Sequence, residues 1–388
     1  MRLLWIATKA PWPPRDGGRL LLFQSLAALA ARGTRVTLVA PVTGAELPTA
    51  LAALAPVCDA RLVVSRPRAR ILAALTAAVS RRPYSLTRHA RPALELAVAR
   101  ELDAGGVRLV VAEQLQAFPQ TSPAAVAGIP RLLRAQNVES DLWRQVGESS
   151  RGFARSLLLR ESARLADAER AAVRNAAMTL ALSLADGERL QSLAGAEARV
   201  EVVPPPFPGE LPVAEQRLAG SPALVLFGSA GWEPNRRAEE RYVSEYWPRI
   251  RAANPAASLH WFGGAGPARA GVFLHPPPRS SAEAFAPGAI LVLPLDIASG
   301  VRMRILEAWA RGVVIVATPA AASGLNAHDG RELLLARNGE EFAVAIERLA
   351  AIPGLAERLI AGGRARLASD HSPERFAARF DALAERFA

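Results

Sequence analysis

Two arginines and a glutamate on one expected helix make the segment 293–310 suited to binding an anion. Its polar residues follow an apolar strand and are, in order, Ser299, Gly300, Arg302, Arg304 and Glu307. A helix that begins near Gly300 places Arg302 and Arg304 in its first turns, where positive charge opposes the helix dipole. A bound anion would offset that cost. The spacing supports equally a surface ladder in which Glu307 pairs with Arg304 or Arg311.

A second candidate for anion binding is the turn between the first expected strand and the helix after it. Its sequence is Pro11-Trp12-Pro13-Pro14-Arg15-Asp16-Gly17-Gly18-Arg19. Paired glycines let the backbone approach a ligand closely, and the N–H groups of a helix N-terminus bind anions. The alternative is an ordinary Pro/Gly turn. No dinucleotide fingerprint is predicted, because this turn is not Gly-x-Gly-x-x-Gly and the run at 264–267 lacks the third glycine.

Polar residues also follow the strand expected at 131–135. Gln136, Asn137 and Glu139 come at its carboxyl end, which in a parallel sheet faces the ligand crevice. The alternative is a plain connection in which Asn137 or Ser140 caps the next helix.

Short apolar runs alternate with helical stretches along the whole chain, and this pattern predicts the fold. The first set of strands is expected at 2–7, 35–40, 60–64, 107–112, 131–135, 178–183 and 200–203, and the second at 223–227, 258–262, 271–274, 289–293, 313–317 and 332–336. Continuous apolar strands separated by helices predict parallel sheets buried on both faces. We therefore expect an α/β protein with two doubly wound, Rossmann-like domains.

Domain boundaries follow from a proline-rich segment at 204–222, which neither a helix nor a central strand tolerates. We expect domains at 1–205 and 206–370 that face a ligand cleft, and a terminal helix at 371–388. Ser372 and Pro373 are good residues to start that helix. Its apolar face, expected to pack back toward the N-terminal domain, consists of Phe376, Phe380, Leu383 and Phe387.

Composition limits the classes of function. The 388 residues carry 47 Lys and Arg against 36 Asp and Glu, a net charge of +11, but Lys9 is the only lysine. The excess thus reflects a general arginine bias, and we expect no nucleic-acid partner. One cysteine and five scattered histidines predict neither disulfides nor a zinc site. No apolar run is long enough to span a membrane, so we expect a soluble, cytoplasmic protein.

The basic excess lies in one half of the chain. Residues 1–205 hold 27 bases and 17 acids, a net charge of +10, which suggests an anionic partner for that half. Within it, the segment 66–82 is an apolar helix flanked by arginines, which can lie on an anionic membrane surface such as the inner face of the cell membrane. The alternative is a core helix with solvated ends.

Together these motifs resemble the GT-B glycosyltransferases, specifically the retaining, nucleotide-sugar-dependent family 4. The 11–19 turn resembles the family's Pro-x-Pro-Pro…Gly-Gly-x-Arg start. Gln136-Asn137-Val138-Glu139 stands where many members have His-Asn-Val-Glu, and Ser183 with Asp186 resembles their Ser-x-x-Asp step. Phe227-Gly228-Ser229, with Trp232-Glu233-Pro234-Asn235, resembles the opening of their donor domain. The most specific match is 299–308, which resembles Ser-Gly-Thr-Arg-Leu-Lys-x-Leu-Glu-Ala.

The resemblance implies a GT-B fold and hexosyl transfer with retention of configuration, from a nucleoside-diphosphate sugar to a saccharide or lipid-linked acceptor. It implies no cofactor and no metal. The N-terminal half would bind the acceptor, with Gln136, Glu139 and Asp16 as catalytic candidates. The C-terminal half would bind the donor, with Glu307 on the ribose hydroxyls. The implied donor-binding residues are Gly17, Gly18, Arg19, Gly228, Asn235, Ser299, Gly300, Val301, Arg302, Arg304 and Glu307. The nucleobase would lie near 274–281.

Three departures from the family pattern bear on mechanism. Ser299 replaces the first acid of the E-x7-E pair, Arg304 replaces a lysine, and Gln136 replaces a histidine. A glutamine can hydrogen-bond a sugar hydroxyl but cannot take its proton. A front-face mechanism, in which the departing phosphate accepts that proton, survives this change. Two alternatives stay open: a catalytically silent partner of another transferase, and a sugar-nucleotide epimerase of the same fold.

Overall fold

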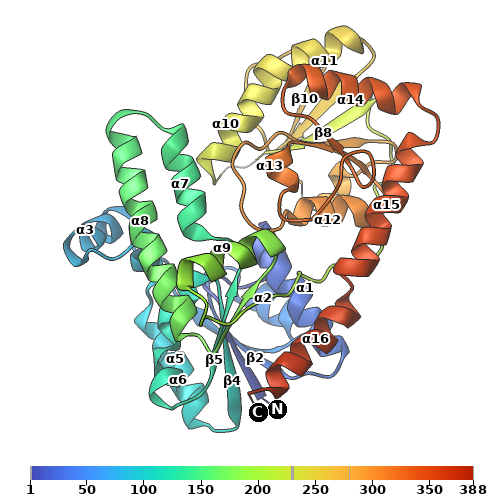
Figure 1. The fold of residues 1–388 in the computed structure, drawn as a ribbon. Helices are drawn as coiled ribbons and strands as arrows, with labels where there is room; N and C mark the ends of the chain where they lie inside the picture. Colours follow the sequence, from blue (N-terminus) through green and yellow to red (C-terminus); the bar gives the residue numbers. More distant parts are fainter. Residues whose placement is uncertain (1, 229–230, 279, 388) are drawn as a thin grey trace. The chain divides into compact units, whose positions relative to one another are not determined.

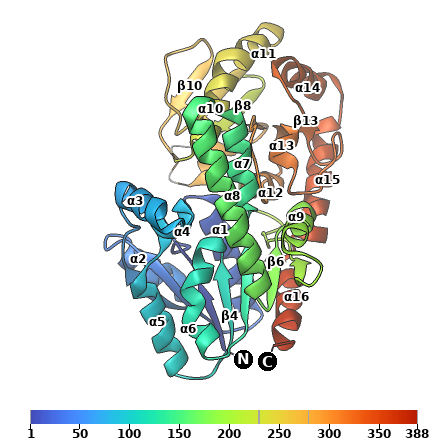
Figure 2. The same ribbon diagram turned by 60° about the vertical axis from the view of Figure 1, so that its left-hand side comes forward.

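The computed structural model describes residues 2–228, 231–278 and 280–387. These residues form two compact units (Figures 1 and 2). The first unit draws on residues 1–206, 299–301 and 373–388, and the second on 207–298 and 302–372. The first unit is therefore assembled from three separate stretches of sequence.

The first unit is built on a parallel sheet of seven strands in the order β3-β2-β1-β4-β5-β6-β7. The strands are β1 (Arg2–Ile6), β2 (Val36–Val42), β3 (Asp59–Val64), β4 (Val107–Glu113), β5 (Arg131–Ala135), β6 (Met178–Ala181) and β7 (Val200–Val202). Successive side chains of a strand point to opposite faces, so β1 contributes Leu3 and Trp5 to one core and Leu4 and Ile6 to the other. This two-sided burial explains why the central strands are almost continuously apolar.

Helices cover both faces of this sheet. They are α1 (Gly17–Ala31), α2 (Leu47–Leu54), α3 (Arg70–Ser80), α4 (Tyr84–His89), α5 (Pro92–Asp103), α6 (Ser122–Val126), α7 (Glu139–Ser149), α8 (Gly152–Asn175) and α9 (Leu184–Ala194), with a 3-10 helix, η1 (Leu115–Thr121). The last helix, α16 (Pro373–Glu385), packs beside α1. The Phe380 ring stacks on Trp5 with a centroid distance of 5.2 Å. Phe376, Phe380 and Leu383 are buried, as the spacing of the apolar residues predicts.

The second unit has a parallel sheet of six strands in the order β10-β9-β8-β11-β12-β13. The strands are β8 (Ala223–Phe227), β9 (Ser258–Phe262), β10 (Val272–His275), β11 (Ile290–Leu293), β12 (Val314–Ala317) and β13 (Leu334–Leu335). The helices are α10 (Glu233–Arg241), the π-helix η2 (Tyr242–Tyr246), α11 (Trp247–Ala253), the 3-10 helix η3 (Ser281–Ala284), α12 (Met303–Ala310), α13 (Pro319–Ala322), α14 (Gly339–Ala351) and α15 (Leu355–Asp370). The predicted α/β class with two parallel sheets is confirmed.

Two local predictions are wrong. The helix expected to begin near Gly300 begins at Met303, because Gly300 has φ +73° and Arg302 is an extended N-cap residue. Arg302 therefore precedes the first turn, and only Arg304 lies within it. The strand expected at 332–336 is only two residues long, because Glu332 is tied by its carboxylate to His328 and Arg366.

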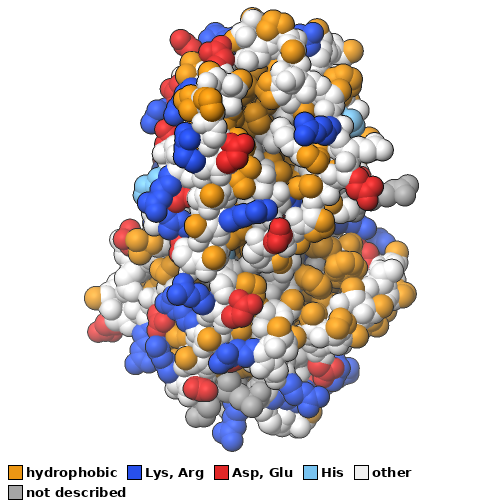
Figure 3. All heavy atoms as spheres, turned by 90° about the vertical axis from the view of Figure 1, so that its right-hand side faces the viewer, with side chains coloured by type: hydrophobic (Ala, Val, Ile, Leu, Met, Phe, Trp, Pro, Cys, Tyr) orange, Lys and Arg blue, Asp and Glu red, His pale blue; other side chains and the backbone are white. Residues whose placement is uncertain are grey.

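Charged side chains are interspersed over much of the surface. Figure 3 shows a face on which basic and acidic groups alternate. The sequences of α15 and of α16 likewise mix arginines with glutamates and aspartates. Such mixing keeps a surface free of a strong field of one sign.

Candidate functional site

The turn before α1 holds Asp16 as the N-cap of that helix. One carboxylate oxygen accepts from the backbone N–H of Arg19 at 3.0 Å, and the other accepts from Lys9 Nζ at 3.1 Å. Burial alone would raise the pKa of Asp16, but Lys9 and the Arg19 N–H together hold it below its ordinary value. The carboxylate thus has a structural function at the start of α1, where Gly17 and Gly18 form the first two positions.

Gln136 lies at the carboxyl end of β5 in a buried polar cluster. Its Nε2 donates to Glu113 Oε1 at 2.7 Å, and its Oε1 accepts from Gln114 Nε2 at 2.6 Å. The Glu113 carboxylate also accepts from Trp5 Nε1 at 2.8 Å and from Arg134 at 3.2 Å. Both ends of the Gln136 amide are therefore engaged, which fixes its orientation.

Gly18 lies against this amide. A Cβ atom on Gly18 would be 2.7 Å from Gln136 Oε1, closer than such contacts come in proteins. The second glycine of the Gly-Gly pair is thus required by the packing of α1 against Gln136. This places two separately predicted motifs, the 11–19 turn and the segment after β5, side by side in the first unit.

Glu139 is the first residue of α7. The N-terminus of this helix is capped by Glu169, a residue that the sequence analysis did not single out. Glu169 of α8 accepts from the backbone N–H groups of Glu139 at 2.6 Å and of Ser140 at 3.1 Å, and from the Ser140 hydroxyl. Burial raises the pKa of Glu139, although a side-chain hydrogen bond from Gln116 opposes the shift. Burial also raises the pKa of Glu169, to about 7. A glutamate in the middle of an Arg- and Ala-rich helix gives no local signal of this function.

The raised pKa of Glu169 leads to a pH-dependent stability. The folded state holds the Glu169 proton more tightly than the unfolded state, whose pKa is near the ordinary 4.5. The free energy of unfolding should therefore fall as pH rises from about 4.5 to about 7, by on the order of 3 kcal/mol from this group. Thermal unfolding across this range should show a smaller fall for Glu169→Gln than for the wild type. Exposed Glu188→Gln should follow the wild type, and equal slopes in all three proteins would contradict the prediction.

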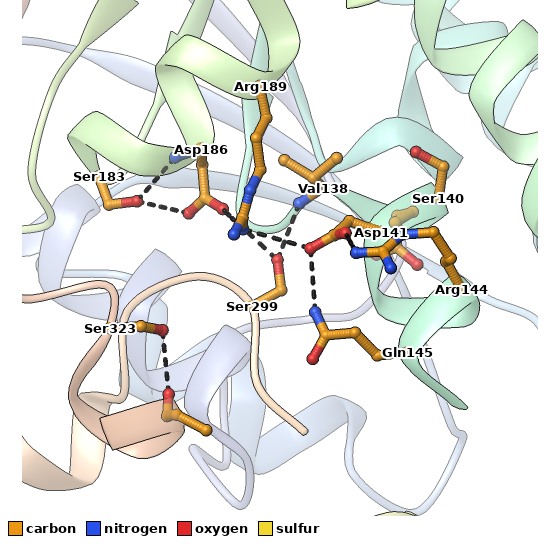
Figure 4. Close-up of polar contacts among 12 residues, drawn as sticks. Val138, Ser140, Asp141, Arg144, Gln145, Ser183, Asp186, Arg189, Ser299 and Ser323 are labelled. Atoms are coloured by element: carbon orange, nitrogen blue, oxygen red, sulfur yellow. Dashed lines mark hydrogen bonds and ion pairs between the residues drawn. The ribbon is translucent and has the colours of Figure 1, made fainter. Parts of the chain in front are cut away.

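Ser299 and Gly300 form part of the first unit and meet two other predicted motifs there (Figure 4). Ser299 Oγ accepts from the backbone N–H of Val138 at 3.1 Å and donates to Asp186 Oδ1 at 3.5 Å. The other Asp186 oxygen accepts from Ser183 Oγ at 2.6 Å. A Cβ atom on Gly300 would be 2.2 Å from the Gln136 carbonyl oxygen, so only glycine fits.

Asn137 adds to this junction. Its side-chain amide, oriented to satisfy its neighbours, donates to the carbonyl oxygens of Ser299 at 2.9 Å and Gln136 at 3.0 Å. The Gln-Asn-Val-Glu, Ser-x-x-Asp and Ser-Gly motifs therefore form one hydrogen-bonded cluster. Val301, the next residue, is buried beside it.

Glu307 in the second unit is a buried carboxylate between two arginines. Only 3% of the residue is exposed. Oε1 accepts from Arg311 at 3.1 Å and from the Ser281 hydroxyl, while Oε2 accepts from Arg304 Nη1 at 2.8 Å. The surface-ladder alternative is right about these partners, but Glu307 and Arg311 are buried, and only Arg304, whose side chain is 34% exposed, reaches the surface.

Arg304 extends the same cluster toward the end of β8. Its guanidinium lies over the Phe227 ring, 3.8 Å from the centroid. Burial lowers the pKa of Arg304, although Glu307 opposes the shift. A cation held between a carboxylate and an aromatic face has donors left for a further anion, because a guanidinium has five N–H groups.

The remaining donor-side candidates of the second unit lie at the ends of elements. A Cβ atom on Gly228 would be 2.6 Å from the Gly263 backbone, so this glycine lets two strand ends approach. Asn235 lies half-buried in the first turn of α10, and Arg302 is half-buried before α12. Ser229 of the 227–229 motif, and Arg279 of the expected nucleobase segment, lie outside the described residues.

The described residues offer neither a grouped metal site nor a membrane-spanning helix. Among these residues, no three His, Cys, Asp or Glu side chains are grouped so that they could hold a metal ion. None of the helices in the described ranges has both the length and the apolar character to cross a membrane.

Known structures share the architecture of the whole chain. Sucrose-phosphate synthase from Thermosynechococcus elongatus has a TM-score of 0.73 at 17% identity, covering 100% of this chain and 98% of that one. Anabaena HepE in complex with UDP and glucose has a TM-score of 0.68 at 14% identity, covering 98% and 99%. S. aureus TarM in complex with fondaparinux, alpha-GlcNAc-glycerol and UDP has a TM-score of 0.68 at 9% identity, covering 99% and 100%. The chain has the GT-B fold.

A family comparison adds to this result. Residues 217–382 match the family described as "Glycosyl transferase-like", so the glycosyl transferase-like domain lies almost wholly in the second unit. Comparison with curated proteins gave no match. The predicted GT-B architecture is confirmed.

Proposed function

We propose that this GT-B protein is a family 4-like glycosyltransferase that moves a hexosyl group from a nucleoside-diphosphate sugar to a saccharide or lipid-linked acceptor, with retention and without a metal. The observation that carries the proposal is the buried Glu307 carboxylate, held by Arg304 and Arg311, inside the glycosyl transferase-like domain. Removing a carboxylate and its arginine partners from water costs free energy, unless a ligand or a close hydrogen-bond network compensates the charges. A ribose diol and a diphosphate together supply matching donors and acceptors.

Each unit would contribute different chemistry. In the second unit, Glu307 would accept from the ribose hydroxyls, and Arg304 with Arg302 would stabilise the charge of the departing diphosphate. In the first unit, the fixed Gln136 amide would orient an acceptor hydroxyl. Because glutamine cannot take a proton, the phosphate leaving on the same face of the sugar would accept it. This route breaks the bond from the anomeric carbon to phosphate and forms the new glycosidic bond with retention.

Nucleotide binding in the purified protein tests the proposal directly. A panel of nucleoside diphosphates and their sugars should include one donor that stabilises the protein by about 2.7 kcal/mol at a hundred times its dissociation constant. Release of nucleoside diphosphate with acceptor, and an unchanged anomeric configuration of the product by NMR, would complete the support. Binding without turnover would favour a silent partner, and interconversion of free nucleotide sugars would favour an epimerase. No binding by any nucleotide would contradict both the transferase and the epimerase.

The Gln136 interpretation makes its own prediction. Gln136→Ala would remove the neutral hydrogen bond to the acceptor hydroxyl, worth about 1 kcal/mol, and should lower turnover roughly fivefold. Gln136→His should keep activity, because an imidazole N–H can donate to the same Glu113 oxygen. Steady-state kinetics of both variants, with circular dichroism to confirm folding, provide the measurement. Complete loss of activity in both folded variants would show that Gln136 has a different function.

A further inference from the structure

Helix α3 turns its large aliphatic side chains toward solvent. Its exposed residues include Ile71 at 77%, Leu72 at 54%, Leu75 at 61% and Val79 at 88% of full exposure. The buried residues of the helix are Ala73 and Ala77. At 100° per residue, the four aliphatic residues share one face and the two alanines lie opposite. The helix therefore packs on its small residues and leaves its more apolar face without a partner.

The stretch of chain that contains α3 carries charge of one sign. Between Asp59 and Glu95 the sequence has no acidic residue, and it has eight arginines at positions 61, 66, 68, 70, 81, 82, 88 and 91. Within 2–228, 231–278 and 280–387, the arginines that flank α3 at 66, 68, 70, 81 and 82 form no ion pair. By contrast, Arg236 of α10 pairs with both Glu233 and Glu240. The α3 region also differs from the mixed charges of the face in Figure 3.

We propose that α3 docks the protein on an anionic lipid bilayer. The helix would lie along the surface with Ile71, Leu72, Leu75 and Val79 in the boundary between headgroups and acyl chains. Flanking guanidinium groups would then meet lipid phosphates. An interfacial helix of this kind buries its apolar face about 5–10 Å deep, and the 11 residues of α3 span about 16 Å. The position of α3 at the edge of the first unit, seen in Figures 1 and 2, leaves room for this contact.

Charge complementarity selects a bilayer over a second copy of the chain. Two α3 faces brought together would also bring two all-arginine rims together, and these repel. An anionic membrane surface attracts such a rim and accepts the aliphatic face in the same contact. The proposal is independent of sugar transfer, since it depends on no residue assigned to the donor or the acceptor.

Flotation of the purified full chain with vesicles tests the apolar face. Wild type should float with mixed phosphatidylcholine–phosphatidylglycerol vesicles at low salt, and less at raised salt. The variant Leu75→Gln/Val79→Gln replaces two aliphatic side chains by glutamine, which is a good helix former. It should weaken the apparent partition of the protein onto the vesicles at least roughly tenfold. The matched control, Val126→Gln/Val344→Gln, changes two exposed valines at 91% and 49% exposure and should float as wild type does. Absence of wild-type binding at low salt, or equal binding of both double variants, would overturn the proposal.

A second pair of variants tests the charges. Arg66→Gln/Arg82→Gln should weaken binding roughly ten- to thirtyfold and flatten its salt dependence. The control Arg348→Gln/Arg358→Gln removes two exposed arginines of the second unit and should have little effect. If the wild type binds pure phosphatidylcholine vesicles as well as anionic ones, the electrostatic part of the proposal is wrong.

A wild-type dimer that becomes monomeric in Leu75→Gln/Val79→Gln would show that a second copy of the chain covers the aliphatic face instead. Donor binding should be unchanged in every variant, which separates this result from failure of the proposed function.

Discussion

Replacing Glu307 by glutamine should weaken binding of the nucleoside-diphosphate donor roughly 10- to 150-fold. Charge-assisted hydrogen bonds to the ribose hydroxyls are worth about 1.5–3 kcal/mol, which converts to that range. Glutamine keeps the shape of the side chain but turns one acceptor oxygen into a donor. A nucleotide titration by calorimetry on the folded variant measures the change.

Loss of a buried carboxylate also affects stability, so the experiment needs a matched control. Glu332 in the same unit is equally buried, at 3% exposure, and pairs with Arg366 at 2.9 Å. Glu332→Gln should lower the unfolding temperature as Glu307→Gln does but should leave the donor dissociation constant unchanged. If Glu307→Gln binds nucleotide as wild type does, Glu307 has only the structural function that its two arginines already show.

Replacing Arg134 by methionine should destabilise the first unit by about 3–5 kcal/mol. Arg134 is completely buried and pairs with Glu113, which is 2% exposed, and it also donates to Ser25 Oγ at 2.9 Å. Removing one partner leaves an uncompensated charge inside the unit, whereas removing both is often close to neutral. Glu113→Gln/Arg134→Met should therefore recover much of the lost stability in thermal unfolding.

An exposed ion pair provides the comparison. Arg236→Met breaks the ion pairs with Glu233 and Glu240 on the surface of α10 and should lower the unfolding temperature only slightly, because exposed pairs contribute little. Because Glu113 also fixes Gln136, Arg134→Met should in addition reduce turnover. A loss of stability in Arg134→Met as small as that in Arg236→Met would mean that the buried Glu113 carboxylate does not need Arg134 as a partner.

The sequence predicts the sheets well because local patterns specify them. Apolar runs such as those of β2 and β11 are buried on both faces, and their spacing with helices allows few other folds. The apolar face of α16 is equally local, since Phe376, Phe380 and Leu383 follow helical spacing.

The site clusters depend on partners far apart in the chain, which is why the sequence did not show them. Trp5 and Glu113 are 108 positions apart, and Arg134 and Ser25 are 109 apart. Nothing near Glu113 or Glu169 distinguishes a buried carboxylate from an exposed one. For α3, both the alanine face and the aliphatic face are apolar, so only tertiary packing could decide which one is buried.

The return of α16 to the first unit has a consequence for the order in which the protein can be made. The core on one side of the first sheet includes Leu3, Trp5 and Leu26 together with Phe376 and Phe380. When the ribosome has synthesised residues 1–206, most of the first unit has therefore been made, but the helix that covers Trp5 has not. The nascent chain must keep this apolar surface uncovered while the entire second unit is translated. Chaperone occupancy on translating ribosomes should accordingly persist until residues 373–387 emerge.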